Sequence, residues 1–476
     1  MRRILSLSYD NLPQHLKTCL LYLSIFPEDY EIERDQVVRR WIAEGFINTE
    51  GGQDLKEIGN CHFNDLINRS LIQPVKIQYD GRVDSCRVHD MILDLLISKS
   101  IEENFATFIG GKNQKLVLHR KARRLSLHYY FHEHTMVPST MFISQCRSLS
   151  IFGYSEHMPS LSNFRALRVL DIENELGELQ HLHTLDLGET KIKKFPKSIV
   201  LMQNLTCLCV NNLELPEEIG NLHALQELSV IKINKNSSAS SLLGLGSLIK
   251  LRILRLCWCI VNTRPDSKAY VDNLLSSLRR LGRANLRRLY IQSYYGYSIE
   301  FLLDSWFPIP HLLQTFCMTM EYHFPRIPFW ITSLENLSYL DINVDSVEQK
   351  ALDVLGNLPS LMYLWVTAKA TVCKERLFIR SSMFISLKEF HFTCLSSGVD
   401  LMFEAGAMTK LVKLMISFYA GDDLYSGFQH LSSLKHLVAE IICSSMTAQE
   451  VQALEEAIRS AVDILPNCPT LEVRIW

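Results

Sequence analysis

The chain has 476 residues, of which 47% are hydrophobic and 21% charged, and its formal net charge is −2. This composition excludes a disordered or collagen-like chain, and the near-neutral charge gives no general attraction to nucleic acid or to an anionic membrane. The length predicts two or more domains or one long repeat array. The sequence has no secretory leader pattern and no long apolar run, so we expect no membrane span and a cytoplasmic location.

The 13 cysteines are scattered along a chain that is large enough to need no disulfide staples, and free thiols are expected. The closest pairs, Cys207 with Cys209 and Cys257 with Cys259, have C-x-C rather than C-x-x-C spacing. No histidine stands beside them at the spacing of a metal ligand. We therefore predict no metal site.

The first hundred residues predict a small module of helices followed by a hairpin. Apolar residues recur at helical spacing in "LPQHLKTCLLYLSIF", in "ERDQVVRRWIAEGFI", where Gly45 should end the helix, and in "LKEIGNCHFNDLINRS". Two short strands, "LIQPVKI" and "VDSCRV", follow with the tight-turn signal Asp80-Gly81 between them. This order predicts an α+β winged-helix module, which we place at residues 1–103.

Winged helices often bind DNA, but this module lacks the charge that DNA requires. Residues 1–100 hold 12 Lys and Arg residues against 15 Asp and Glu residues. A face that contacts phosphates needs clustered positive charge. We therefore predict no nucleic-acid partner.

The module ends with "RVHDMILDLL", in which His89 and Asp90 stand at the start of an apolar helix. The plain interpretation is a capped helix, because a carboxylate at this end favours the positive pole of the helix dipole. Nothing nearby in the sequence looks like a catalytic partner for the pair. The residues alone leave a structural cap and a functional contact as equal alternatives.

After a basic connector at residues 104–121, the chain becomes repetitive. The pattern L-x-x-L-x-L, or a close variant, occurs 12 times, mostly at intervals of 20 to 27 residues. The copies begin at Leu167, Leu182, Leu205, Leu225, Leu251, Leu286, Leu313, Leu337, Leu361, Leu387, Leu411 and Leu434. This period predicts an α/β leucine-rich-repeat solenoid over residues 122–476, a horseshoe with a concave parallel sheet.

Three stretches of the repeat region are irregular. The 35 residues from Leu251 to Leu286 leave room for an inserted helix in "SKAYVDNLLSSLRRLG". The 15 residues from Leu167 to Leu182 are too few for a full turn of the solenoid. The stretch "NKNSSASS", which starts at Asn234, is expected to be a flexible loop.

The repeat pattern also predicts a binding face. The leucines of each copy point into the core, and the residues between them point to the other side of the strand. Tyr, Trp and Arg on one surface are the residue types that carry interface energy. The predicted protein-binding residues are Arg255, Tyr290, Tyr339, Asp341, Tyr363, Trp365 and His391. The alternative is that neighbouring copies pack some of these side chains against one another.

The first module also carries residues of a known family. "CLLYLSIFPED", "WIAEGF" and the helix that starts at His89 resemble the winged helix of the plant NB-ARC leucine-rich-repeat disease resistance proteins. With the repeats, the resemblance covers essentially the whole chain. It implies an intracellular immune receptor whose repeats recognise a pathogen effector or a guarded or decoy host protein.

The resemblance gives the His-Asp pair a role. Val88-His89-Asp90 is similar to the family's Met-His-Asp motif, in which the histidine contacts the β-phosphate of ADP in the resting state. Val88 departs from that motif by a conservative apolar exchange. The resemblance therefore implies that the winged helix acts as an ADP-sensing latch in the intact receptor.

The family's nucleotide-binding domain is not part of this sequence, which has no G-x-x-x-x-G-K-[ST] phosphate loop. We therefore expect the chain to be the C-terminal part of a longer receptor. ADP or ATP should bind together with the missing domain and not tightly to this chain alone. The full receptor could also lie at the plasma membrane or in the nucleus.

No motif of hydrolases or metalloproteases occurs, so we predict no enzyme and no catalytic residue. Two other functions remain open at this point. The chain could be a truncated decoy or regulator that binds through its repeats without nucleotide switching. It could also be an F-box-like repeat adaptor, although the winged-helix residues argue against that.

Overall fold

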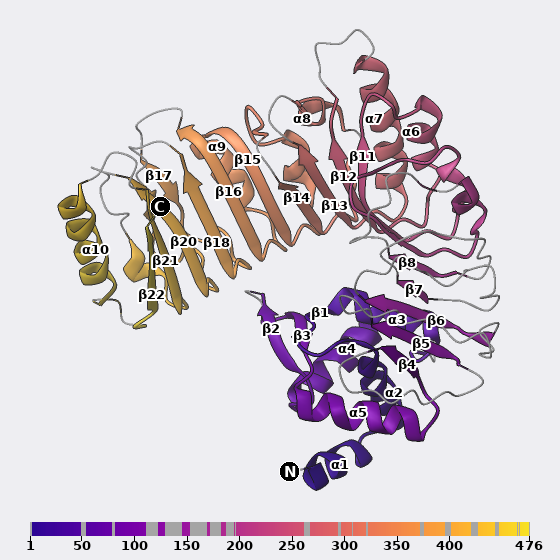
Figure 1. Cartoon of the computed structure of the whole chain (residues 1–476). Coiled ribbons are helices and arrows are strands. Elements are labelled where there is room, and N and C mark those ends of the chain that lie inside the picture. The colour runs from indigo at the N-terminus through magenta and orange to yellow at the C-terminus, as the bar shows by residue number, and fades with distance from the viewer. Residues whose placement is uncertain are drawn as a thin grey trace. The chain divides into compact units, whose positions relative to one another are not determined.

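A computed structural model of the protein describes residues 2–48, 54–78, 81–110, 122–128, 145–152, 169–171, 182–186, 195, 197–260, 267–293, 297–306, 308–319, 322–371, 376–395, 401–419, 427–442, 447–463, 465 and 467–475. They belong to two compact units, Met1–Ile231 and Lys232–Trp476 (Figure 1). Among the described helices, none is both long and apolar enough to cross a membrane.

The first unit begins with the winged-helix module. Its helices are α1 (Arg2–Asp10), α2 (Gln14–Tyr22), η1 (Leu23–Ile25), α3 (Arg34–Glu44), α4 (Leu55–Asn68) and α5 (Asp90–Glu102). Its wing is an antiparallel sheet in which β3 (Val83–Arg87) lies between β1 (Ile32–Glu33) and β2 (Gln73–Ile77). The predicted helices and hairpin are confirmed. Gly45 ends α3 with a φ of 78°, and Gly81 has a φ of 80° in the hairpin turn, while Asp80 lies outside the described residues.

Seven parallel strands follow in the first unit. They are β4 (Thr107–Gly110), β5 (Arg124–His128), β6 (Ser148–Phe152), β7 (Val169–Asp171), β8 (Thr184–Asp186), β9 (Cys207–Cys209) and β11 (Glu227–Ile233), each paired with the next. The shorter elements are η4 (Lys197–Leu201), β10 (Leu213–Glu214) and η5 (Ile219–Asn221). Strand β4 occupies the start of the stretch predicted as a connector, whose residues 111–121 lie outside the described part.

The winged helix and these first strands share one hydrophobic core. Phe108 of β4 and Phe152 of β6 belong to the same buried cluster as Phe26, Trp41 and Phe63 of the module. The ring of Phe152 lies 5.8 Å from that of Phe26. Burial of such large apolar side chains is the dominant stabilising contribution in a fold of this kind.

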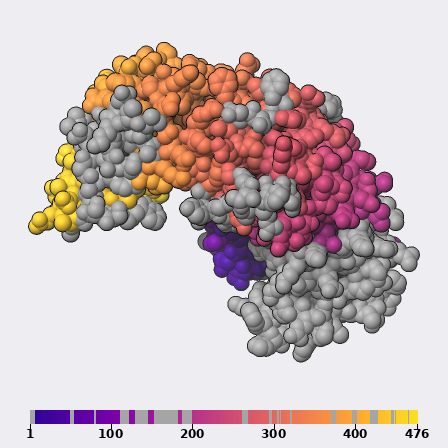
Figure 2. Space-filling view, turned by 90° about the horizontal axis from the view of Figure 1, so that it is seen from above, coloured from indigo at the N-terminus to yellow at the C-terminus, as the bar shows by residue number. Residues whose placement is uncertain are grey.

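The second unit is a stack of parallel strands with helices beside it (Figure 1). The stacked strands are β12 (Ile253–Trp258), β13 (Arg288–Ser293), β14 (Thr315–Thr319), β15 (Tyr339–Val347), β16 (Tyr363–Thr371), β18 (Glu389–Cys394), β20 (Lys413–Tyr419), β21 (His436–Ile442) and β22 (Thr470–Ile475). The remaining elements are α6 (Ala239–Leu245), α7 (Ser267–Arg283), α8 (Leu302–Ser305), η6 (Phe329–Ser333), α9 (Gln349–Gly356), β17 (Leu377–Ile379), β19 (Leu401–Phe403), η7 (Phe428–His430) and α10 (Ala448–Asp463). In Figure 2 the described repeats of this unit follow one another in chain order, from magenta through orange to yellow.

The repeat motif specifies the strands closely. A strand begins two residues after the first leucine of every predicted copy, as Tyr339 does after Leu337. The short copy at Leu167 keeps this register, because β7 pairs with β8 at Val169 and Thr184. The inserted helix is confirmed as α7. The predicted leucine-rich-repeat region with its parallel sheet is thus confirmed.

The prediction of a flexible loop at "NKNSSASS" is wrong for its second half. Helix α6 begins at Ala239, and the hydroxyl of Ser238 accepts a hydrogen bond from the backbone N–H of Ser241 at 3.0 Å. Serine is a favoured N-cap residue, because its side chain satisfies a backbone donor that has no partner within the helix. A serine-rich run can therefore start a helix as readily as it forms a loop.

Candidate functional site

His89 is the N-cap of α5. Its Nδ1 accepts a hydrogen bond from the backbone N–H of Met91 at 3.3 Å, and its carbonyl accepts from the N–H of Leu93 at 2.9 Å. His89 and Asp90 are both exposed, whereas Val88 is buried and fixes the start of the helix. The cap is thus the histidine itself, and the Asp90 carboxylate lies in the first helical turn, where the helix dipole favours negative charge.

The predicted binding residues of the second unit form an uninterrupted row across the sheet. Strand pairing places Arg255 beside Tyr290, Tyr290 beside Cys317, and Cys317 beside Asp341. The row continues through Trp365 and His391 to Met415, Val438 and Glu472. A second row, two residues earlier on each strand, places Tyr339 beside Tyr363 and Tyr363 beside Glu389.

Neighbouring rings in these rows lie against one another, some stacked and some tilted. The rings of Tyr339 and Tyr363 are nearly parallel at 4.2 Å, and those of Trp365 and His391 lie 4.7 Å apart. The guanidinium of Arg255 lies 4.5 Å from the ring centre of Tyr290. The prediction that Tyr363 and His391 point outward to a partner is wrong, because both side chains are buried against those of neighbouring copies. Strands are about 4.8 Å apart in a sheet, so planar side chains in register cover one another.

Polar groups in the rows are partly removed from water. Cys317 Sγ donates to Asp341 Oδ2 at 3.3 Å, and burial raises the pKa of the Asp341 carboxyl to about 6. Glu389 is hydrogen-bonded to His391 and forms an ion pair with Lys413 at 3.0 Å. The half-buried members of the rows, Arg255, Tyr290, Tyr339, Asp341 and Trp365, are the ones that keep surface for a partner.

In the first unit, the parallel strands have the same kind of face, formed by the residues between the core leucines. The winged helix packs on this face. Helix α3 contacts β7 and β8, and the Arg39 guanidinium donates to both carboxylate oxygens of Glu227 on β11 at 3.1 Å. Glu44, at the end of α3, accepts from Arg124 Nε of β5 at 3.1 Å. Burial raises the pKa of Glu44, while the charge of Arg124 acts in the opposite direction.

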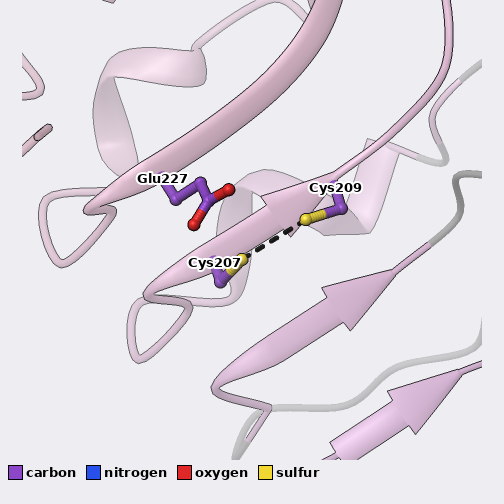
Figure 3. Close-up of side chains that lie close together, drawn as sticks. All are labelled: Cys207, Cys209 and Glu227. Carbon is purple, nitrogen blue, oxygen red and sulfur yellow. Dashed lines mark hydrogen bonds between the residues drawn. The ribbon is translucent and has the colours of Figure 1, made fainter. Parts of the chain in front are cut away.

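A group of possible metal ligands lies next to Arg39. The sulfurs of Cys207 and Cys209 are 3.5 Å apart on β9, and the Glu227 carboxylate joins them from β11 (Figure 3). All three residues are buried, and burial raises the pKa of the Cys207 thiol well above its usual range. The sequence analysis singled out the cysteine pair but missed the acid. The repeat period was the available signal, because Cys207 and Glu227 occupy the same position in successive copies.

Comparison with known proteins decides the family. The family model described as "Disease resistance protein Winged helix domain" matches residues 25–96, and that described as "Leucine-rich repeat region" matches residues 172–471. The chain belongs to the disease resistance proteins of plants. The segment of this chain that matches the winged-helix model includes α3, the wing and the start of α5, so His89 lies within it.

Curated disease resistance proteins match over most of this chain. "Disease resistance protein Pik-2" of Oryza sativa is 32% identical over 444 residues, which are 78% of this chain and 43% of the relative. "Disease resistance protein RGA5" of the same species is 28% identical over 98% of this chain and 45% of the relative. "Probable disease resistance RPP8-like protein 2" of Arabidopsis thaliana is 26% identical over 92% and 52%. The chain thus spans about half the length of these relatives.

Proposed function

We propose that this chain is the sensing part of a disease resistance receptor, and that the half-buried row in the second unit binds a pathogen effector or a guarded host protein. The observation that carries the proposal is the in-register row from Arg255 to Trp365, which presents a cation, aromatic rings and a carboxyl on one face. Large, rigid aromatic side chains and Arg are the usual anchors of a protein interface. The role is one of binding rather than catalysis.

The experiment is a cell-death assay of the full-length receptor in leaf tissue exposed to a pathogen isolate that it recognises. Substitution Trp365→Ala should abolish or strongly reduce the response, because it removes the largest half-buried ring of the row. The control is Arg283→Ala, at an exposed position on α7 outside the rows. Accumulation of each variant must equal that of the wild type. A full response from the Trp365 variant would contradict the proposed face.

We also propose that His89 holds ADP in a receptor that also contains a nucleotide-binding domain. Its Nδ1 is used by the helix cap, so the opposite ring nitrogen, Nε2, is the atom that would meet a phosphate oxygen. The exposed start of α5 favours such an anion, because the backbone N–H groups of a helix start carry partial positive charge. Support comes from this geometry and from the resemblance of Val88-His89-Asp90 to the family's motif.

Two substitutions at His89 distinguish its proposed contact with ADP from its role as the N-cap of α5. In a receptor that includes the nucleotide-binding domain, His89→Asn keeps a capping side chain but loses the imidazole, whereas His89→Ala loses both. Constitutive cell death from both variants would support a phosphate contact. If only the alanine variant is active without a pathogen, the cap explains the effect and the latch role fails. The isolated chain should bind ADP no better than at millimolar concentration, and calorimetric detection of micromolar binding would contradict this.

A further inference from the structure

The cluster of Cys207, Cys209 and Glu227 has the geometry of a chelating site. The two cysteines are next-but-one neighbours on β9, so their side chains point to the same face of the strand. Glu227 on β11 pairs in register with Cys207, which brings its carboxylate to that face. The ligand atoms of all three residues lie within 4.8 Å of one another (Figure 3).

The distances and donor types fit a thiophilic divalent cation. Tetrahedral zinc with Zn–S bonds of about 2.3 Å separates two sulfurs by about 3.8 Å, close to the observed 3.5 Å. Two thiolates and one carboxylate are ligands that zinc accepts, and cadmium shares the preference for sulfur. The three ligands are on two adjacent strands of a parallel sheet, so little movement is needed to bring them together.

We propose that Cys207, Cys209 and Glu227 form a binding site for a thiophilic divalent cation such as zinc, which competes with Arg39 for the Glu227 carboxylate. This inference goes beyond the proposed receptor function and does not depend on it. Each cysteine that ligates the ion loses its thiol proton to solvent, and no electron transfer is involved.

Arg39 sets the strength of this site. Its guanidinium donates to both oxygens of Glu227, and both side chains are largely buried, with exposed fractions of 15% and 7%. A single guanidinium nitrogen, Nη1, donates to both oxygens and so occupies lone pairs that a metal ion would use. With a divalent ion bound, the charges of two thiolates, Glu227 and Arg39 would still balance, so the cluster can be neutral in either state. The ion therefore replaces the contact of Glu227 with Arg39 and leaves the net charge of the cluster unchanged.

The chain contains a matched control pair. Cys257 and Cys259 have the same C-x-C spacing on the sheet, and their sulfurs are also 3.5 Å apart. Among the residues that the structure describes, however, no carboxylate completes a three-ligand group there. The positive charge that acts on Cys257 comes from Lys232, which would repel a metal ion. Two sulfurs alone should thus bind the ion much more weakly than the complete group.

Binding would also act on the winged helix. The Arg39–Glu227 contact links α3 to β11, so an ion that takes Glu227 frees Arg39 from the strand. The contact between Glu44 and Arg124 is outside the cluster and would remain. The site would therefore loosen the middle of α3 without detaching the helix.

The test is a titration of the full, reduced, metal-free chain with cadmium, followed by the thiolate-to-metal absorption in the ultraviolet, with zinc as competitor. We expect a single ion per chain. Cys209→Ser should lower the affinity at least tenfold, and Cys257→Ser with Cys259→Ser should leave it unchanged. Arg39→Met should raise the affinity, because it removes the competitor for Glu227 and keeps an apolar side chain of similar length.

The opposite results are equally clear. Absence of the absorption band from the wild type, or its persistence in Cys209→Ser, would overturn the site. Equal loss in the Cys257 and Cys259 control would mean that cadmium binds to exposed or unfolded thiols. A Cys209 variant that fails to fold can be recognised by circular dichroism, and the Arg39→Met variant, once circular dichroism has shown that it is folded, then decides the question. Unchanged or weaker binding by Arg39→Met would contradict the competition.

Discussion

His89 has a structural role that can be measured in this chain without nucleotide. His89→Ala removes the acceptor for the N–H of Met91 and should lower the free energy of unfolding of the first unit by about 1 kcal/mol. His89→Asn should cost less, since asparagine is a good N-cap. Urea unfolding of the two variants measures the difference. Equal stability of the alanine variant and the wild type would show that the cap contributes nothing.

Asp341 should give the second unit a distinctive dependence on pH. Its folded-state pKa of about 6 lies above the ordinary value of 3.8, because burial disfavours the charged carboxylate. The folded chain therefore binds this proton more tightly than the unfolded chain. The stabilising contribution is complete below about pH 4 and is lost as the pH rises through about 6.

Asp341→Asn tests this linkage. The variant should be more stable than the wild type by about 1–3 kcal/mol at pH 7, and the two should converge near pH 4. Asparagine keeps an oxygen that can accept from Cys317. Unfolding by urea at several pH values provides the comparison. Parallel curves for the two proteins over this range would contradict a raised pKa.

At the scale of elements, the sequence predicted the positions of strands better than the exposure of their side chains. The leucine pattern located β15 and β16, because leucines in the core fix both the strand and its register. Burial of Tyr363 depends on the ring of Tyr339 in the preceding copy. The single-copy pattern contains no information on that neighbour. For the same reason, the pattern of a single copy did not indicate Glu227, which is brought next to Cys207 only by strand pairing.

Gly45 and Gly427 both have a positive φ, but only at Gly427 would an added side chain also clash with neighbouring atoms. Gly45 has a φ of 78° and open space where a Cβ would lie, so Gly45→Ala should cost about 1 kcal/mol. Gly427 has a φ of 92°, and an added Cβ there would collide with the backbone carbonyl of Phe403. Gly427→Ala should therefore cost more than about 2 kcal/mol. Thermal or urea unfolding measures both, and equal costs would mean that the backbone at Gly427 relaxes freely.

At the scale of the whole molecule, the compact first unit joins the winged helix to the first repeat strands. Arg124→Met leaves the Glu44 carboxylate buried without its cation and should cost about 3–5 kcal/mol. Met keeps an apolar chain beside Phe105, on which the Arg124 guanidinium packs at 4.1 Å. Hydrogen exchange should show α3 and β5 losing protection together, while β15 and β16 are unaffected.

A second variant identifies the cause of that loss. Glu44→Gln combined with Arg124→Met removes both charges, and it should recover much of the stability, because no unpaired charge then remains buried. A double variant as unstable as the single one would attribute the effect to packing. Sequence analysis could not anticipate this pair, because the two residues are far apart in the chain and only the folded unit brings them together.

The strand of each predicted copy begins two residues after the first leucine of the motif, and this constant spacing affects how such a chain can evolve. Copies meet at the same motif position whether 15 or 35 residues separate them, because the extra residues lie outside the paired strands. Unequal crossing-over between copies would therefore insert or delete one row of face residues and leave hydrogen bonding between the surviving strands intact. Recombination of whole copies would thus give new combinations of surface side chains on strands that keep the same register.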